Sequence, residues 1–173
     1  CIRFRVSDVR LFVGRSSTGV RGIRLAKGDR VISSAIIKSM SATTEERAAY
    51  LKMSRAVRGD IESDNDENEE NNENITPAIL SDEKYAEMGA SEQFILSISN
   101  NGYGKRTSTF EYRVTGRGGK GIIAMVVNDR NGNIADSFPV DAANQIILVT
   151  NNGKLIRCPV DDIRIASRST QGV

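Results

Sequence analysis

A six-residue pattern occurs three times in this chain and governs the interpretation of the rest of the sequence. It reads Arg-Ser-Ser-Thr-Gly-Val at residues 15–20, Arg-Gly-Gly-Lys-Gly-Ile at residues 117–122 and Arg-Ser-Thr-Gln-Gly-Val at residues 168–173. Each copy is an arginine, three small or polar residues, a glycine and a β-branched residue. A pattern that recurs at a fixed spacing is typical of repeat architectures, so the sequence predicts a protein built from similar structural units.

The spacing between the copies shows a period and one interruption. The second and third arginines lie 51 residues apart, and the Asn-Gly pairs at 101–102 and 152–153 give the same 51. The first and second arginines lie 102 apart, twice that period, yet nothing resembling the pattern occurs near the midpoint. An insertion of about one repeat length explains this better than a lost repeat does.

Short apolar runs between these landmarks predict β-strands. Residues 95–99 and 146–150 each precede an Asn-Asn-Gly turn signal. Two further apolar runs follow the glycine pattern, at 20–25 and 31–37 in the first unit and at 122–127 and 134–140 in the second. About four short strands in roughly 50 residues is the size of a propeller-type blade. A β-sandwich also has many short strands, but nothing requires its sequence to repeat at a fixed period. We therefore predict an all-β, propeller-like arc of four-stranded blades that is too short to close.

The insertion divides the chain into three parts, at residues 1–38, 39–93 and 94–173. Within it, Thr-Thr-Glu-Glu at residues 43–46 resembles a capping box, which predicts a short helix. Residues 81–92 predict a second helix with Tyr85 and Met88 on one side. Residues 59–74 are almost wholly Asp, Glu and Asn, a composition that favours disorder because it buries little apolar surface.

The net charge of +2 conceals two parts of opposite sign. The whole chain has 24 Lys and Arg against 22 Asp and Glu, whereas residues 39–93 have 5 against 14. The remaining residues therefore have 19 basic and 8 acidic side chains, a net charge of +11. A surplus of this size is what a polyanion-binding surface requires. The acidic insertion suggests a further hypothesis, that it mimics DNA and competes for the basic surface.

The arginines repeat with the units. Each unit has a pair of arginines seven residues apart, followed four or five residues later by the arginine of the glycine pattern. Arginine binds phosphate well because its planar fork donates two hydrogen bonds, although single exposed arginines are often only solubilising. The predicted DNA-binding residues are Arg3, Arg10, Arg15, Lys105, Arg106, Arg113, Arg117, Lys120, Arg157, Arg164 and Arg168.

The composition excludes most catalytic chemistry within the chain. There is no histidine and there are only two cysteines, so neither histidine catalysis nor a thiolate zinc cage can be assembled, and we expect no catalytic and no metal site. Residues 116–121 differ from a Walker loop because Gly121, not Ser or Thr, follows Lys120. Their glycines are expected to allow positive φ and close approach to a ligand phosphate. No signal peptide or spanning segment is evident, which favours the cytoplasm, and the start at Cys1 suggests a fragment.

At these residues the sequence resembles the C-terminal domain of the DNA gyrase A subunit. The resemblance is carried by residues 18–23, by Asn-Gly-Tyr-Gly-Lys-Arg-Thr at 101–107 and by the glycine patterns at 117–121 and 168–173. It implies a β-pinwheel, a propeller-like disc whose neighbouring blades exchange a strand and whose basic rim wraps double-stranded DNA. The family implies a non-catalytic module of a bacterial, ATP-dependent type IIA topoisomerase that introduces negative supercoils. ATP, Mg²⁺ and the DNA-cleaving tyrosine would belong to other parts of an A2B2 assembly with the gyrase B subunit.

Two departures from the family pattern leave alternatives open. The family's signature box reads Gln-Arg-Arg-Gly-Gly-Lys-Gly, whereas residues 115–121 read Thr-Gly-Arg-Gly-Gly-Lys-Gly, so they are interpreted as a blade equivalent of the box. The insertion at 39–93 is not part of the shared pattern. The alternatives are the equivalent domain of topoisomerase IV and a propeller-like module that binds acidic protein partners.

Overall fold

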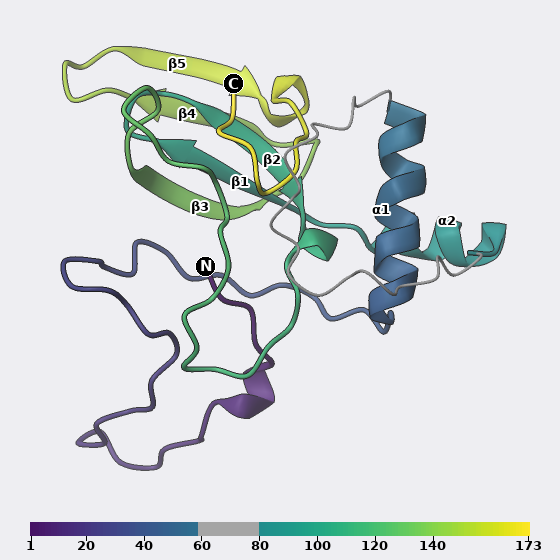
Figure 1. Ribbon diagram of the computed structural model, residues 1–173. Helices are drawn as coiled ribbons and strands as arrows, with labels where there is room; N and C mark the ends of the chain where they lie inside the picture. The colour runs from purple at the N-terminus through teal and green to yellow at the C-terminus, as the bar shows by residue number, and fades with distance from the viewer. Residues whose placement is uncertain (59–79) are drawn as a thin grey trace.

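Two small antiparallel sheets form the β part of the structure, a computed structural model that describes residues 1–58 and 80–173 (Figure 1). The first sheet has the strand order β2-β1-β3 and the second is the hairpin β4-β5. The strands are β1 (Phe94–Ser99), β2 (Gly104–Ser108), β3 (Ile134–Val140), β4 (Gln145–Val149) and β5 (Leu155–Pro159). The tract predicted to be disordered, 59–74, lies outside the described residues.

The strands expected before each Asn-Asn-Gly turn are confirmed as β1 and β4. Each pairs with the strand that follows it, in equivalent registers: Leu96 opposes Arg106, and Ile147 opposes Arg157. The turn glycines Gly102 and Gly153 have φ of 88° and 75°, values that only glycine adopts without a steric cost. The repeat predicted from the sequence is therefore a repeat of structure.

The described residues of unit 1 (residues 1–38) contain no strand, so the strands predicted at 20–25 and 31–37 are not formed, and the strand predicted at 122–127 in unit 2 (residues 94–140), the equivalent of 20–25, is not formed either. In unit 2, β1 is the central strand, and both β2 and β3 pair with it. Residues 31–37 are the equivalent of β3 in the repeat, but the described residues of unit 1 contain no counterpart of β1. Without a central strand, residues 31–37 have no ladder in which to form a strand, whereas residues 122–127 stay outside the sheet although β1 is present in unit 2.

Units 2 and 3 each insert their glycine pattern into the unit before them. In unit 3 (residues 145–173), the amide of Ala166 donates to the Arg106 carbonyl at 2.8 Å, and the amide of Val173 donates to the Gly104 carbonyl at 3.1 Å. One repeat earlier, the amides of Thr115 and Ile122 donate to the carbonyls of Arg3 and Cys1, at 2.8 and 2.7 Å. Figure 1 shows the last residues of the chain, in yellow, running beside β2 and β1. The fold is thus an incomplete β-pinwheel whose neighbouring units exchange a segment.

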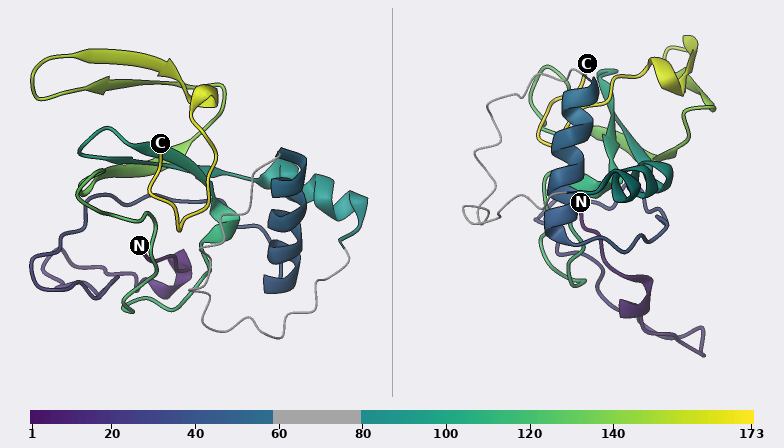
Figure 2. Two further views of the ribbon diagram at one scale, coloured as in Figure 1. Left: turned by 45° about the horizontal axis from the view of Figure 1, so that its top comes forward. Right: turned by 90° about the vertical axis from the view of Figure 1, so that its right-hand side faces the viewer.

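Side chains pack on both faces of the β2-β1-β3 sheet. Consecutive residues of β1 point to opposite faces, so Ile95 and Leu96 lie on different sides. Ile95 packs with Tyr112 and Ala124 on one face, against Ile37 of unit 1. Leu96, which has no exposed surface, packs with Ile146 and Val160 of unit 3 on the other. Figure 2 shows the β4-β5 hairpin as a separate layer over that face. Burial of apolar side chains between the units therefore supports the exchange.

The insertion forms two helices that pack on unit 2, α1 (Thr44–Arg58) and α2 (Asp82–Ser91). The predicted capping box is present, because the Glu46 amide donates to Thr43 Oγ1 at 3.2 Å and the Thr43 amide donates to the Glu46 carboxylate at 2.8 Å. Ser81 caps α2 by accepting a hydrogen bond from the Lys84 amide. Both predicted helices are confirmed. Neither of these helices in the described part of the chain is long and apolar enough to cross a membrane.

Candidate nucleic-acid interface

The first arginine of the repeated set lies inside the interface between two units. Arg106 is 6% exposed, and its guanidinium donates to the carbonyls of Ile163 and Asp161, at 2.6 and 2.9 Å, and to the Asp161 carboxylate at 3.3 Å. These acceptors flank or belong to the 3₁₀ turn Val160–Asp162 of the next unit. All three donating nitrogens are directed at protein atoms, which does not fit the expected phosphate contact, so we leave Arg106 out of the candidate interface.

Arg3, one unit earlier, makes the equivalent contact. Its Nη1 donates to the carbonyls of Thr109 and Tyr112 at 2.7 and 3.2 Å, on either side of the 3₁₀ turn Thr109–Glu111. Burial lowers the pKa of Arg3, and the positive charge of Arg47 lowers it further. The first arginine therefore joins one unit to the next in both of the interfaces between units that the described residues form.

The arginine of the glycine pattern reaches in the opposite direction, to the unit before. Arg117 Nη1 donates to the carbonyl of Arg21 at 3.1 Å, and Arg168 Nη1 donates to the carbonyl of Ile123 at 3.2 Å. Arg21 and Ile123 are equivalent positions, two residues after the glycine of the pattern in units 1 and 2. Arg117 stays exposed and Arg168 is half-buried. The guanidinium of this arginine therefore also stabilises the exchange between units.

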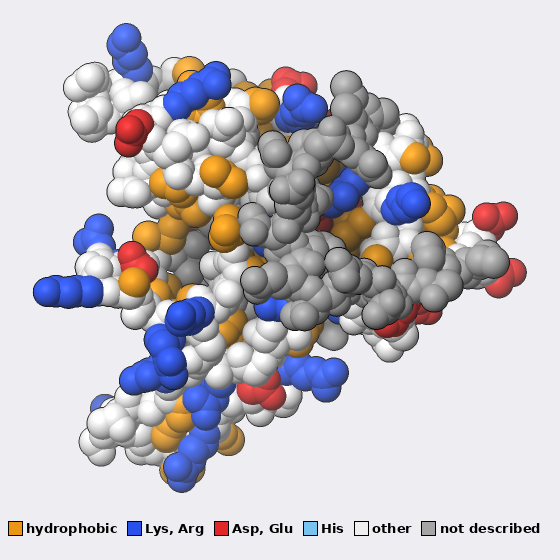
Figure 3. Space-filling view, in the orientation of Figure 1, with side chains coloured by type: hydrophobic (Ala, Val, Ile, Leu, Met, Phe, Trp, Pro, Cys, Tyr) orange, Lys and Arg blue, Asp and Glu red, His pale blue; other side chains and the backbone are white. Residues whose placement is uncertain are grey.

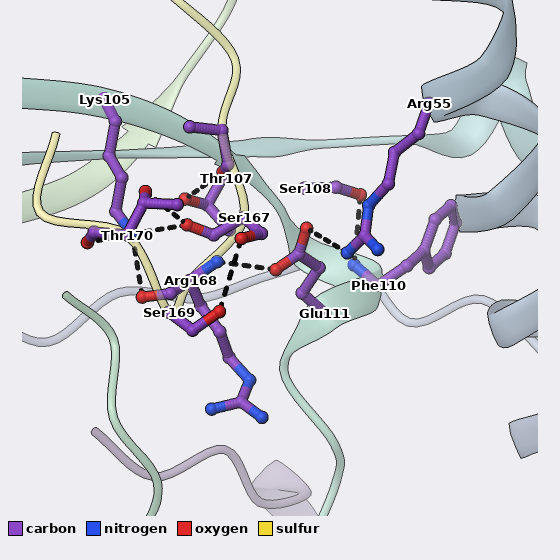
Figure 4. Close-up of polar contacts among 11 residues, drawn as sticks. Arg55, Lys105, Thr107, Ser108, Phe110, Glu111, Ser167, Arg168, Ser169 and Thr170 are labelled. Atoms are coloured by element: carbon purple, nitrogen blue, oxygen red, sulfur yellow. Dashed lines mark hydrogen bonds and ion pairs between the residues drawn. The ribbon is translucent and has the colours of Figure 1, made fainter. Parts of the chain in front are cut away.

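Lys105 is fully buried, contrary to the expectation of a phosphate contact. Its ammonium donates to the carbonyls of Ser167, Arg168 and Thr170 at 2.6, 2.8 and 3.0 Å (Figure 4). Burial lowers the pKa of Lys105 to about 8, and the charge of Arg168 adds to this effect while Glu111 opposes it. The buried Lys105 ammonium therefore binds the inserted segment of unit 3, so we also leave Lys105 out of the candidate interface.

The glycines of the pattern have the expected positive φ, with 82° at Gly121 and 81° at Gly172. The close approach is to protein backbone: a Cβ on Gly121 would collide with the carbonyl of Cys1, and a Cβ on Gly172 would lie 3.1 Å from the carbonyl oxygen of Gly104. These two carbonyls are equivalent in the repeat. The glycines thus allow the exchanged segment to approach the unit that receives it, and the approach to a ligand phosphate stays a prediction.

Six of the predicted residues remain exposed and are not used in these interfaces. Three of them are the middle arginine of each unit, which is exposed in all three units, and the other three come from different positions of the repeat. The middle arginines are Arg10, Arg113 and Arg164, and the others are Arg15, Lys120 and Arg157. Arg113 and Lys120 line one cleft together with Gly119 and Gly121. Among the repeated arginines, only the middle one is exposed in every unit, and these three residues, Arg10, Arg113 and Arg164, are called the exposed row below.

Several further basic residues belong to the same surface and were missed by the search for repeated positions. Unit 1 has 9 Lys and Arg against 2 Asp and Glu, and most of these side chains are exposed. Figure 3 shows Lys and Arg side chains gathered on the lower left of the molecule, where Figure 1 draws unit 1. The residues of unit 1 that were not predicted are Arg5, Arg21, Arg24, Lys27, Arg30 and Lys38. The charge of residues 1–38 counted alone would have indicated them.

The exchanged segments and the basic surface define a class of protein, the propeller-like repeat proteins whose blades are joined by strand exchange. A sequence model of the family described as "DNA gyrase C-terminal domain, beta-propeller" matches residues 1–38, 93–141 and 144–173. This match covers more than half of the chain, so the chain belongs to that family. The matched ranges leave out residues 39–92, which include both helices of the insertion.

Curated relatives extend the similarity over the whole chain. The DNA gyrase A subunit of Rickettsia bellii is 45% identical over 99% of this chain and 19% of its own length. The gyrase A subunit of Escherichia coli K12 is 34% identical over 99% of this chain and 14% of its own length. A solved structure of a DNA gyrase A C-terminal domain aligns with 47% of this chain and 28% of that chain, at 24% identity and a TM-score of 0.45. The chain thus spans about a fifth or less of the length of the two curated gyrase A subunits.

Proposed function

We propose that this chain is a DNA-binding and DNA-wrapping module, and that it holds duplex DNA through the exposed row Arg10, Arg113 and Arg164. One observation carries the proposal: of the three arginines in the repeat, the middle one is exposed in every unit. The other two are directed at backbone carbonyls wherever the neighbouring unit is present. A solvent-facing arginine at the same position of successive units suits a ligand that is itself periodic and negatively charged.

The chemistry of the row favours phosphate over base recognition. Arginine forks donate two hydrogen bonds to phosphate oxygens, and neutralising phosphates releases counterions. The described surface offers few aromatic side chains for stacking: Tyr103, for example, lies under the guanidinium of Arg130, whose Nε donates to the tyrosine hydroxyl at 2.9 Å. Binding should therefore depend strongly on salt and weakly on sequence.

In the parent protein this module would bend DNA so that the complete enzyme introduces negative supercoils. The relatives named above are gyrase A subunits, which supports a bacterial, cytoplasmic type IIA topoisomerase as the parent. The chain contributes no catalytic group to that scheme. ATP hydrolysis and DNA cleavage would take place in other parts of an A2B2 assembly with the gyrase B subunit.

The test compares duplex-DNA affinity at several salt concentrations for the wild type and for three variants, Arg10→Ala, Arg113→Ala and Arg164→Ala. Each variant should bind more weakly, and each lost phosphate contact should reduce the slope of log K against log salt by about 0.9. The control is Lys52→Ala, which removes an exposed charge from helix α1 of the insertion. Wild-type affinity in all three arginine variants would contradict the proposal, and salt-insensitive binding would favour a protein-interaction module instead.

A further inference from the structure

The insertion docks at a position where unit 2 differs from its neighbours. Phe110, 7% exposed, lies in the 3₁₀ turn of unit 2 and packs with Tyr50 of α1 and Met88 of α2. The ring centroids of Tyr50 and Phe110 are 5.3 Å apart in an edge-to-face arrangement. The equivalent positions of the other units are Ser7 and Asp161, both polar and exposed. Of these three equivalent positions, only the one in unit 2 has an apolar residue, and the insertion covers that residue.

The next residue, Glu111, connects three parts of the chain. Its Oε1 forms an ion pair with Arg55 Nη2 of α1 at 3.2 Å. Its Oε2 accepts a hydrogen bond from the backbone amide of Arg168 in unit 3 at 2.6 Å. Figure 4 shows the carboxylate between the two arginines. The Glu111 side chain is only 9% exposed, whereas the equivalent residues Asp8 and Asp162 are exposed. Unit 2 therefore has a buried carboxylate at the one turn that also carries the insertion.

The segment that Glu111 contacts is the same one that Lys105 holds from inside. Lys105 donates to carbonyls of residues 167, 168 and 170, and Glu111 binds the amide of residue 168 from the side of α1. This segment follows Arg164, whose carbonyl accepts the Arg106 amide at 2.9 Å. The exposed Arg164 therefore directly precedes the segment that Lys105 and Glu111 hold against unit 2.

We propose that the insertion is a strut, in which Arg55 fixes Glu111 and Glu111 fixes the glycine pattern of unit 3 against unit 2. Arg55 and Glu111 are then positioning residues for the exposed arginine row, and the consequence for DNA rests on the proposed function above. A strut of this kind explains why a long insertion between two blades contributes a cluster of buried side chains. A passive surface loop needs neither Phe110 nor a buried carboxylate.

The first test uses the protein without DNA and measures hydrogen exchange of the Arg168 amide by NMR in Arg55→Ala and Glu111→Ala. Glu111→Ala removes the acceptor, so exchange should become at least about 10-fold faster, because a hydrogen bond to a charged group is lost. Arg55→Ala leaves the acceptor but frees it to move, so a smaller acceleration of about 3-fold is expected. The control variant is Lys52→Ala on the same helix, and the control amide is Thr150, which donates to Lys154 in the β4-β5 turn.

The second test measures the bending of an end-labelled DNA duplex by energy transfer with the same variants. Both strut variants should bend the duplex less than the wild type at saturating protein. An unchanged Arg168 exchange rate in both variants overturns the strut, whatever DNA does. If Arg168 exchange is faster but the variants bend DNA as the wild type does, only the effect on the exposed row is overturned. If the wild-type protein itself does not bind DNA, only the proposed function is contradicted. The Thr150 amide shows whether a variant has remained folded.

Discussion

Arg106 Nε donates to the carbonyl of Ile163 at 2.6 Å, across the interface between units 2 and 3, and Arg3 reaches the equivalent carbonyl of Tyr112 one unit earlier. Two contacts related by the repeat indicate that this arginine is part of the pinwheel itself. The third arginine of this type, Arg157, is exposed, and its Nε donates to Gln145 within its own hairpin. The first arginine of the repeat is thus buried in unit 2, as Arg106, and exposed in unit 3, as Arg157.

Arg106→Ala should therefore destabilise the protein far more than Arg157→Ala. Removing Arg106 leaves the carbonyls of Asp161 and Ile163 without their partner in a buried interface, with an expected cost of about 3 kcal/mol. Arg157→Ala should cost less than about 0.5 kcal/mol, as exposed substitutions usually do. Urea unfolding followed by circular dichroism measures both. Equal losses of stability would contradict the structural role of Arg106.

Lys105 predicts a specific dependence of stability on pH. Its pKa is about 8 in the folded protein against an ordinary value of 10.5, so the unfolded chain binds more protons between these two values. The free energy of unfolding should therefore gain a contribution that grows as pH rises from about 8 to 10.5. The measurement is the difference in unfolding free energy between wild type and Lys105→Met across this range.

The difference in unfolding free energy between wild type and Lys105→Met is needed because other groups titrate in an adjoining pH range. Burial raises the pKa of Tyr50 and of Tyr112 to about 12, so these tyrosines lower stability above pH 10 in both proteins. Their effect cancels in the comparison. A wild-type minus variant difference that stays flat or falls between pH 8 and 10.5 would show that the ammonium is not destabilised by burial.

Gly121→Ala and Gly19→Ala separate backbone conformation from contact between units. Both glycines belong to the repeated pattern and have positive φ, 82° and 77°, so alanine at either position should cost about 1–2 kcal/mol. Gly19 has no atom within 4 Å of an added Cβ, whereas at Gly121 the Cβ would collide with the Cys1 carbonyl. Gly121→Ala should therefore cost about 1–3 kcal/mol more. Thermal or urea unfolding measures the difference, and identical costs would argue against close packing of the exchanged segment.

Phe110→Asp gives unit 2 the residue that unit 3 has at the equivalent position. The substitution removes the ring that packs on Tyr50 and places a charge against the insertion helices, so the insertion should detach. Helices as short as α1 and α2 are marginal without tertiary contacts, so the circular dichroism signal at 222 nm should decrease. The matched control, Asp161→Ala, should leave the signal unchanged. A full helical signal in Phe110→Asp would mean that Phe110 is not the docking point.

Much of the local structure could be predicted from the sequence, because it depends on neighbouring residues. The turn glycines at 102 and 153, the strands before them and the capping box at Thr43 and Glu46 are all decided within a few positions. The absence of the strands expected at 31–37 and 122–127 was not predicted, because the apolar pattern of a segment does not reveal whether a partner strand lies beside it.

The sequence by itself determined the period, the incomplete arc of units and the basic character of the scaffold outside the insertion. Only the tertiary structure decided which repeated arginine faces solvent, since the acceptors of Arg106 lie 55 to 57 residues away and those of Arg117 lie 96 and 109 residues away. The same holds for the insertion, whose role depends on Phe110 and Glu111 meeting side chains from α1. A guanidinium is equally basic in any sequence, but whether it binds a carbonyl or remains available for a phosphate depends on what the fold places beside it.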